Sequence, residues 1–297
     1  MKKISDLLFD YLSIECDSDI SDSQSSDRGI KKEEYEIKNE RESKQFGKPI
    51  GKYQLISIPN VLEYFNEDIE YCTIEVAKAF KCIIGDIKIT DKILVVGLGN
   101  RHISSDSLGA KVVGGINITI DTKTLPKVMA VAPSVMGLTG IETVEIIEGI
   151  ASKVKPTHVI LIDSLCASNS SRLGRSIQIT NTGVCPGGGI GNKRKCIGDN
   201  IAPKVFSIGV PLLIYASTFV SSTFEKYDIG SDKINNIMHS IKKYRNKDNI
   251  LKIFTSIKSI LNDDIDNMIV SIKDIEESVI ILSKIISQAI NIVLGVV

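Results

Sequence analysis

The stretch Ile93-Leu-Val-Val-Gly-Leu-Gly-Asn100 is a continuous apolar run that ends in a glycine-rich turn. Its first six residues, Ile93–Leu98, have the length of an ordinary strand and carry no polar side chain. Strands of this kind are buried on both faces, which is typical of a parallel sheet covered by helices. The stretch therefore predicts a central strand of an α/β fold, followed by a tight turn.

The segments around this strand alternate between strand and helix patterns. Short apolar runs predict further strands at Lys127–Ala132, Val159–Ile162, Ser176–Thr180 and Val205–Gly209. Helical patterns lie between several of them. Such an alternation implies a three-layer α/β architecture, with a mostly parallel or mixed sheet and helices on both of its faces.

Local start signals place four helices. They are expected at 104–116 behind serine N-caps, at 139–153 behind the capping-box pattern Thr139-Gly-Ile-Glu142, after Pro211, and at Ile272–Leu294. The last of these carries apolar residues around much of its circumference, as a core helix does. The chain after Ser231 is therefore expected to be helical.

Residues 1–45 differ in composition from residues 46–297. Asp17–Arg28 is rich in serine and aspartate, and Lys31–Lys44 is dense in charges of both signs. Because little in these stretches could fill a core, we expect residues 1–45 to form a mobile or weakly docked N-terminal extension, a candidate propeptide. Residues 46–297 are expected to form one α/β domain.

Composition narrows the class of protein. The chain has 36 Lys and Arg against 36 Asp and Glu, a balance that argues against an electrostatic nucleic-acid binder. No secretory signal follows Met1, and Lys284 and Asn291 interrupt the apolar C-terminal stretch, so neither end predicts a membrane span. Six scattered cysteines without a CxxC pair indicate reduced thiols in the cytoplasm.

Two aspartates follow predicted parallel strands. Asp106 lies in the loop and helix start after Ile93–Leu98, and Asp163 directly follows Val159–Ile162. In open α/β sheets ligands bind outside the carboxyl ends of the strands, where both carboxylates would face one cleft. Such a pair supplies a general base for water and an acid for the scissile group. Taken singly, each aspartate is better explained by helix capping or by a turn than by catalysis.

A second loop, 185–195, is rich in glycine and basic residues. Its backbone amides, together with Asn192, Lys193 and Arg194, are candidates for binding a carboxylate or an oxyanion. Asn100, in the turn after the central strand, is another such candidate. The loop lacks the spacing of a nucleotide-binding P-loop, and a flexible, solvated surface loop explains it equally well.

Other chemistries have less support in the sequence. A metal site made of His102, Asp106 and Asp163 is imaginable, but no clustered ligand spacing indicates it. Cys166 is better interpreted as a small buried residue than as a nucleophile. A serine nucleophile elbow of the GxSxG type is missing. We therefore expect neither a metal nor another cofactor.

Several distinctive motifs run through about two-thirds of the chain. The longest is Pro133-Ser-Val-Met-Gly-Leu-Thr-Gly-Ile-Glu-Thr143. The others, in chain order, are Gly47–Ile50, Val96–Asn100, Asp106–Gly109, Ile162–Leu165, Gln178–Gly183, Gly191–Arg194 and Ile208–Pro211. Together these motifs resemble those of the spore germination protease family.

This resemblance implies a function. Members of the family are endopeptidases of an unusual aspartic type that degrade small acid-soluble spore proteins early in germination, and their two essential aspartates match Asp106 and Asp163. They are made in the forespore as zymogens, lose a short propeptide, form homotetramers, and are not regarded as metal-dependent. Their fold resembles that of the hydrogenase-maturation endopeptidases, which do use a metal.

The chain departs from the family pattern at two places. Tyr215 stands where the family usually carries an aspartate, and Tyr11–Asp19 differs from the usual propeptide cleavage site. Two alternatives therefore accompany the endopeptidase interpretation. One is a metal-dependent maturation endopeptidase of the same fold, and the other is a catalytically weak homologue that only binds spore proteins.

Overall fold

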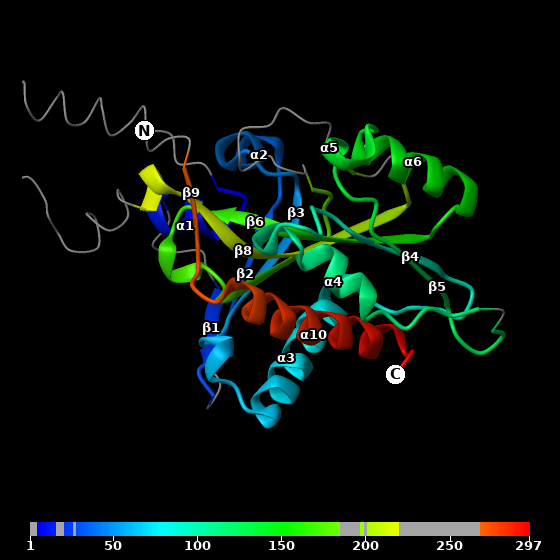
Figure 1. Ribbon diagram of the computed structural model, residues 1–297, viewed down its shortest axis with the longest axis horizontal. Helices are drawn as coiled ribbons and strands as arrows, with labels where there is room; N and C mark the ends of the chain where they lie inside the picture. The colour runs from blue at the N-terminus through cyan, green and yellow to red at the C-terminus, as the bar shows by residue number, and fades with distance from the viewer. Residues whose placement is uncertain are drawn as a thin grey trace, which may run out of the picture.

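The computed structural model describes residues 5–15, 21–25, 28–120, 122–184, 197–198, 201–219 and 268–297 (Figure 1). The helices, including the short 3-10 turns η1 to η3, are α1 Phe9–Glu15, α2 Glu40–Phe46, η1 Val61–Glu63, α3 Asn66–Ile84, η2 Ser104–Asp106, α4 Leu108–Gly114, α5 Met136–Thr139, α6 Thr143–Val154, η3 Ser170–Arg172 and α10 Ile275–Leu294. The strands are β1 Ser21–Ser25, β2 Lys31–Ile37, β3 Gly51–Ser57, β4 Lys92–Gly97, β5 Lys127–Val131, β6 His158–Ala167, β7 Ser176–Thr180, β8 Lys204–Tyr215 and β9 Ile269–Ser271.

The strands form one mixed sheet. Among the described residues its order is β1-β2-β3-β7-β8-β6-β4-β5, and β9 pairs with β8 off this path. The half made of β8, β6, β4 and β5 is parallel, whereas β1, β2, β3, β7 and β9 pair antiparallel with their neighbours. The predicted central strand is β4, which lies between β5 and β6. The prediction of a mixed sheet is confirmed.

One face of this sheet is sealed by α3, α4 and α10 (Figure 1). Phe80 of α3, Val112 of α4 and Leu282 of α10 belong to a single apolar cluster. The same cluster contains Ile160 of β6 and Phe206 of β8. Within the described chain, α10 is long and apolar enough to cross a membrane, yet 61% of its apolar window is buried inside the protein. Its composition is that of the core helix that the sequence predicts.

The opposite face is covered in two separate places. Toward β4 and β5, α6 packs Val144 and Ile147 on Val159 and Leu161 of β6. At the other end, α2 and the segment Leu7–Leu12 cover β3 and the end of β6. Helices thus lie on both faces (Figure 1), and the three-layer α/β prediction is confirmed.

The two strands at the site run further than predicted. Asp163 lies inside β6, not at its end, and β8 continues past Pro211 to Tyr215. The prediction that Pro211 opens a helix is wrong. Pro211 pairs with Leu165 at a point where the register of the β6–β8 ladder shifts, and an irregularity of this kind tolerates a proline inside a sheet.

The predicted capping box at Thr139 is also wrong. Thr139 ends the short helix α5, and α6 begins only at Thr143, behind Glu142. The Thr139 hydroxyl accepts the amide of Ile141 at 3.2 Å, so it stabilises the turn between two helices and caps neither. Serine and threonine make local backbone bonds of this kind readily, and the sequence pattern does not distinguish them from a cap.

The expectation of a weakly docked N-terminal extension is wrong for residues 5–12 and 28–45. Leu7, Leu8, Phe9 and Leu12 are at most 1% exposed, and β2 pairs with β3 along its whole length. The serine-rich and charged stretches dominate the composition of residues 1–45 and obscure the short apolar segment Leu7–Leu12. That segment is long enough to form an apolar cluster with the end of β6.

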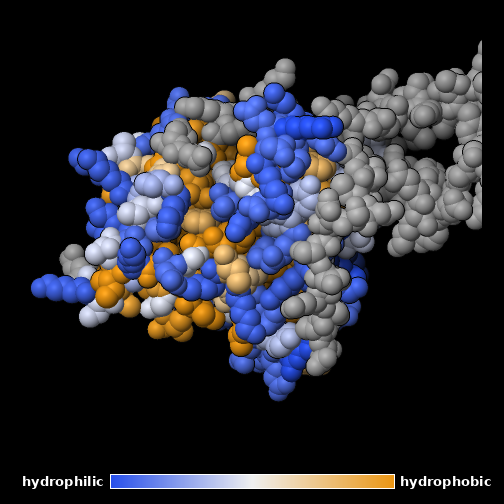
Figure 2. All heavy atoms as spheres, turned by 180° about the vertical axis from the view of Figure 1, so that it is seen from behind, coloured by the Kyte–Doolittle hydropathy of each residue, from blue (hydrophilic) through white to orange (hydrophobic). Residues whose placement is uncertain are grey.

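The surface seen from behind is mainly hydrophilic, and apolar residues reach it in separate groups (Figure 2). Large exposed apolar side chains on the described residues include Met136 and Leu138 of α5 and Ile141 in the turn after it. Apolar atoms make up much of any protein surface, so these residues do not by themselves identify a partner.

Candidate active site

The turn after β4 positions Asp106. The ladder between β4 and β6 ends where Leu98 donates its amide to the carbonyl of Ile162 at 2.8 Å. The chain then turns through Gly99, whose φ of 96° favours glycine, and a Cβ there would lie 2.7 Å from Oδ1 of Asp106. The Asn100 amide donates to Oδ2 of Asp106 at 2.7 Å. The glycine-rich turn therefore wraps the Asp106 carboxylate.

Asn100 holds this turn together. Besides its amide bond to Asp106, its side-chain oxygen accepts the His102 amide at 3.0 Å. The structure thus places this predicted candidate next to Asp106, where its described contacts orient the carboxylate. The role of Asn100 in binding substrate remains a prediction.

Asp163 lies on β6 just beyond the point where β4 ends. Its partner on β8 is Gly209, and its side chain is buried, with 7% of the residue exposed. Oδ1 accepts the amide of Ser164 at 2.9 Å. A Cβ at Gly209 would lie 2.5 Å from the side chain of Leu165, so glycine at this position leaves Leu165 its place beside Asp163.

The two predicted aspartates influence each other. Burial raises the pKa of Asp163 well above its ordinary value, and the negative charges of Asp6 and Asp106 raise that pKa further. The hydrogen bond from the Ser164 amide lowers the pKa of Asp163, but its effect is smaller than that of burial and of the two carboxylates. The net effect favours the protonated form of Asp163 over that of an isolated aspartate.

A cavity of about 560 Å³ opens over Asp163. Its floor is the sheet itself, with polar side chains such as Gln178, Thr180 and Ser207 next to Asp163. Its walls come from the N-terminal segment 5–11 and from the turn between α2 and β3. The site is therefore the uncovered part of the sheet face between the two apolar clusters, with room for an extended peptide.

Asp6 is a third carboxylate at this site, and sequence reasoning missed it. Its amide donates to the Cys166 carbonyl at 2.8 Å, and its Oδ2 accepts the Cys166 amide at 2.9 Å. Asp6 precedes the apolar run Leu7-Leu-Phe9, and an aspartate directly before such a run was the signal that could have revealed it. The interpretation of residues 1–45 as weakly docked concealed it.

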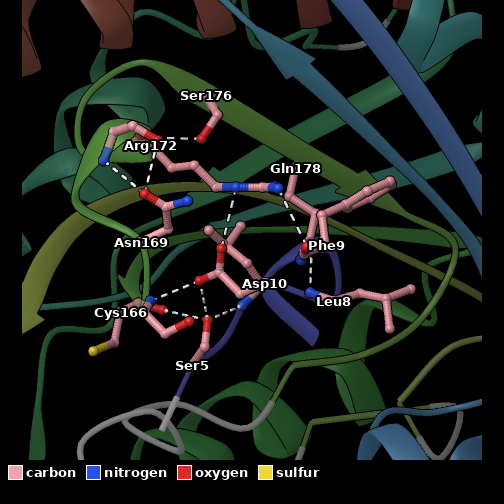
Figure 3. A network of polar contacts seen from close by, with 12 residues as sticks. Ser5, Leu8, Phe9, Asp10, Cys166, Asn169, Arg172, Ser176 and Gln178 are labelled. Carbon is pink, nitrogen blue, oxygen red and sulfur yellow. Dashed lines mark hydrogen bonds and ion pairs between the residues drawn. The ribbon is translucent and has the colours of Figure 1, made fainter. Parts of the chain in front are cut away.

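The N-terminal segment is fastened by a polar network around Asp10 (Figure 3). Oδ2 of Asp10 accepts the Ser5 hydroxyl at 2.7 Å and the Ser168 amide at 2.6 Å, and Oδ1 forms an ion pair with Nε of Arg172 at 3.1 Å. Gln178 accepts the amide of Leu8 at 3.0 Å. This network holds residues 5–10 against the end of β6 and beside the cavity.

The remaining sequence candidates fall in different places. His102 is exposed, and His158 lies at the amino end of β6, where burial lowers its pKa. Cys166 is 2% exposed, and burial raises the pKa of its thiol to about 12, which agrees with a buried residue and not with a nucleophile. Asn192, Lys193 and Arg194 lie outside the described residues.

Ligand clusters were sought across the part of the chain that the structure describes. There, no group of three or more His, Cys, Asp and Glu side chains is arranged to hold a metal ion. Tyr215, where the resemblance leads one to expect an aspartate, is the last residue of β8 and pairs with Ile269 of β9.

Comparisons with known protein sequences identify relatives of this chain. The family model described as Germination protease matches residues 15–228. The Germination protease of Caldanaerobacter subterraneus subsp. tengcongensis is 34% identical over 291 residues, which cover 93% of this chain and 88% of the relative. That of Clostridium tetani is 35% identical over 288 residues, covering 89% and 85% of the two chains, and that of Clostridium acetobutylicum is 36% identical over 278 residues, covering 87% and 83%.

The fold and its relatives define the chain as a peptidase with an α/β architecture. More narrowly, it belongs to the germination protease family. The sequence resemblance is thus confirmed, and with it a role as a protease in spore germination.

Proposed function

We propose that this protein is an endopeptidase that begins the degradation of small acid-soluble spore proteins during germination, with Asp106 and Asp163 activating a water molecule. The observation that carries the proposal is the buried Asp163 at the floor of a cavity of about 560 Å³, near enough to Asp106 for the charge of Asp106 to raise its pKa. A partly enclosed site strengthens the hydrogen bond that a protonated Asp163 donates to the leaving amine.

The environments of the two aspartates support different roles. Asp163 is the general acid, because burial and its carboxylate neighbours favour its protonated form. Asp106 is the general base, because its carboxylate already accepts the Asn100 amide and lies just before the N-terminus of α4, and both features stabilise negative charge. Asp106 removes a proton from water as the water attacks the carbonyl, and Asp163 donates a proton to the departing amine.

The N-terminal segment is a candidate propeptide. Residues 5, 6 and 11 line the cavity that contains Asp163, and the Asp6 carboxylate helps to raise the pKa of Asp163. A substrate backbone and this segment would occupy overlapping space. The segment therefore has to leave the cleft, or be cut, before a protein substrate can enter.

The proposal includes a setting and an assembly. Family membership supports action in the spore core or forespore cytoplasm, on spore proteins as substrate. A homotetramer, the absence of a cofactor, and the absence of direct contact with nucleic acid or membrane remain predictions from the sequence. Analytical ultracentrifugation of the full chain tests the first of these.

A metal-dependent maturation endopeptidase of the same fold remains the alternative within the enzyme class. It would need protein ligands beside Asp106 and Asp163, and the exposed position of His102 gives it little support. Treatment with a chelator separates the two. The aspartic mechanism predicts unchanged digestion of a spore protein, whereas the alternative predicts loss of digestion and its return with one divalent ion.

A homologue that only binds spore proteins is the alternative from another class. Tyr215 is the residue that favours it, and the buried Asp163 with Asp106 nearby argues against it. The experiment is digestion of a purified small acid-soluble spore protein by the full chain, with the Asp163→Asn variant as the inactive control. Fragments formed by the wild type alone support the enzyme. Binding without fragments in either case supports the homologue.

A further inference from the structure

Lys48 lies in the same cavity as Asp163 but has no part in the proposed hydrolysis. It belongs to the turn between α2 and β3, which forms one wall of that cavity. Burial lowers the pKa of its ammonium, and the charges of Asp6 and Asp10 counteract that effect. Lys48 is half-buried, and a cation partly removed from water is stabilised by a partner of opposite charge or a strong acceptor.

The contacts of this ammonium come from the N-terminal segment. Nζ of Lys48 donates to the carbonyl oxygen of Ser5 at 3.1 Å and lies 5.9 Å from the centre of the Tyr11 ring. The carboxylates that raise its pKa, Asp6 and Asp10, belong to the same segment. Lys48 therefore binds the main chain of a peptide lying in the cleft and faces acidic side chains of that peptide.

The same peptide is held at the edge of β6, beyond the point where β4 ends. The Asp6 amide donates to the Cys166 carbonyl, a main-chain bond that any sequence can make. The Cys166 amide donates to the Asp6 carboxylate, a bond that requires an acidic side chain. The second bond therefore gives this position its specificity.

From these contacts we propose that Lys48 is a specificity-determining residue. Its ammonium binds a main-chain carbonyl of the substrate, and the Cys166 amide binds the acidic side chain of the next substrate residue. Residues Ser5 and Asp6 occupy this subsite in the structure. The subsite takes an extended acidic peptide, with Asp or Glu at the position of Asp6. The inference rests on the proposed function, since it concerns substrate recognition by the same site.

The chain offers a matched control for Lys48. Lys44 lines the same cavity, but its side chain is 82% exposed and its nearest described partner is Glu40 of its own helix, at 3.8 Å. Replacing either lysine by methionine removes one charge from the cavity wall. Of the two, Lys48 is the one that contacts the docked segment, so only its replacement should change recognition.

The first experiment uses two capped synthetic peptides as inhibitors of spore-protein digestion by the full chain. One has the sequence of residues 5–12, and the other carries Asp6→Asn. We expect the wild type to bind the aspartate peptide about tenfold more tightly, since a charge-assisted bond becomes a neutral one. Lys48→Met should lose this preference, Lys48→Arg should keep most of it, and Lys44→Met should match the wild type.

Two outcomes overturn the inference while the proposed function stands. One is an active wild type that neither peptide inhibits, and the other is a folded Lys48→Met enzyme that discriminates between the peptides as the wild type does. If the wild type digests no spore protein, the proposed function has failed, and amide hydrogen exchange decides the inference by itself. Lys48→Met should then exchange faster than the wild type in residues 5–12, with α3 unchanged, and equal exchange would overturn it.

Discussion

The two faces of the sheet differ in what covers them. The face under α3, α4 and α10 is sealed by a single large apolar cluster. The other face carries two smaller clusters, one under α6 and one under the N-terminal segment, with polar residues and Asp163 on the strands between them. Both faces are formed by the same strands, since alternate residues point to opposite sides. The first face stabilises the fold, and the second provides the site.

The largest effect should follow from changes to the carboxylates of the open face. We expect Asp106→Asn or Asp163→Asn to lower kcat for spore-protein digestion by about a thousandfold or more, because each removes a group that moves a proton in the proposed mechanism. Circular dichroism should show a folded protein in both cases. A folded variant that retains near-normal turnover would remove that aspartate from the mechanism.

A change on the sealed face should lower the stability of the fold and leave the groups of the candidate site in place. Phe80 is fully buried and packs edge-on against Phe206, with 6.4 Å between ring centres. Phe80→Ala should lower the free energy of unfolding by about 3–5 kcal/mol, through lost burial and the cavity left behind. Urea denaturation measures this.

The matched change on the open face is Ser207→Ala. The Ser207 hydroxyl donates to the Thr182 carbonyl at 3.2 Å, so this variant should lose only about 1 kcal/mol. Similar losses for Phe80→Ala and Ser207→Ala would mean that the two faces do not divide stability and function in this way.

The cover of the open face should be removable at the Asp10 network. Asp10→Asn weakens the ion pair with Arg172, which should cost about 1–3 kcal/mol locally because both groups are mostly buried. A trace of protease should then cut within residues 1–15 sooner than in the wild type. If the segment is a propeptide, spore-protein digestion should also rise.

Asp68→Asn is the control for this network. It breaks a pair of similar length, Arg28 to Asp68 at 3.0 Å, that lies at the surface. We expect no change in either measurement, because exposed ion pairs contribute little. Lower activity in Asp10→Asn, with a normal fold, would show that the segment supports the site instead of blocking it.

The smallest effect concerns pH. The folded pKa of Asp163 is raised above the ordinary value of 3.8, so the unfolded chain loses this proton at a lower pH than the folded protein does. The contribution of Asp163 to stability is therefore present below about pH 4 and is lost as the pH rises through the folded pKa. Asp163→Asn removes this loss, and we expect its free energy of unfolding at pH 7 to exceed that of the wild type by about 1 kcal/mol.

The control for this prediction is Asp86, whose pKa is shifted downward instead of upward. An ion pair with Lys81 lowers the pKa of Asp86, which is fully exposed, so Asp86→Asn should not stabilise the protein at pH 7. Thermal unfolding from pH 3 to pH 8 compares the variants. An Asp163→Asn advantage that is constant over this range would contradict the burial of an ionisable Asp163.

The central layer of this fold was predictable because its strands are continuous apolar runs. Ile93–Leu98 has no polar residue to confuse its periodicity, and the observed β4, Lys92–Gly97, agrees within one residue. Pro211 and Thr139 were misread because a ladder irregularity and a turn between helices decide their roles. Both features depend on contacts with other segments, Leu165 for Pro211 and the α5–α6 turn for Thr139.

The site was predictable only in part. The rule that ligands bind beyond the carboxyl ends of parallel strands selected Asp106 and Asp163 as candidates, and the structure brings them near enough for the charge of Asp106 to raise the pKa of Asp163. Asp163 nevertheless lies inside β6, because β6 runs on past the end of β4. Asp6 and Lys48 lie on segments distant in sequence, and tertiary docking places them beside Asp163. A pattern within one stretch of sequence carries no information about contacts between segments that are distant in the chain.

The most direct test compares the single variants Asp106→Asn and Asp163→Asn with the double variant, by steady-state digestion of one spore protein. Groups that act as a unit are non-additive, so the double variant should be hardly less active than either single variant. If the kcat loss of the double variant equals the product of the two single losses, the aspartates act independently. That result would contradict an aspartate pair acting on one water molecule.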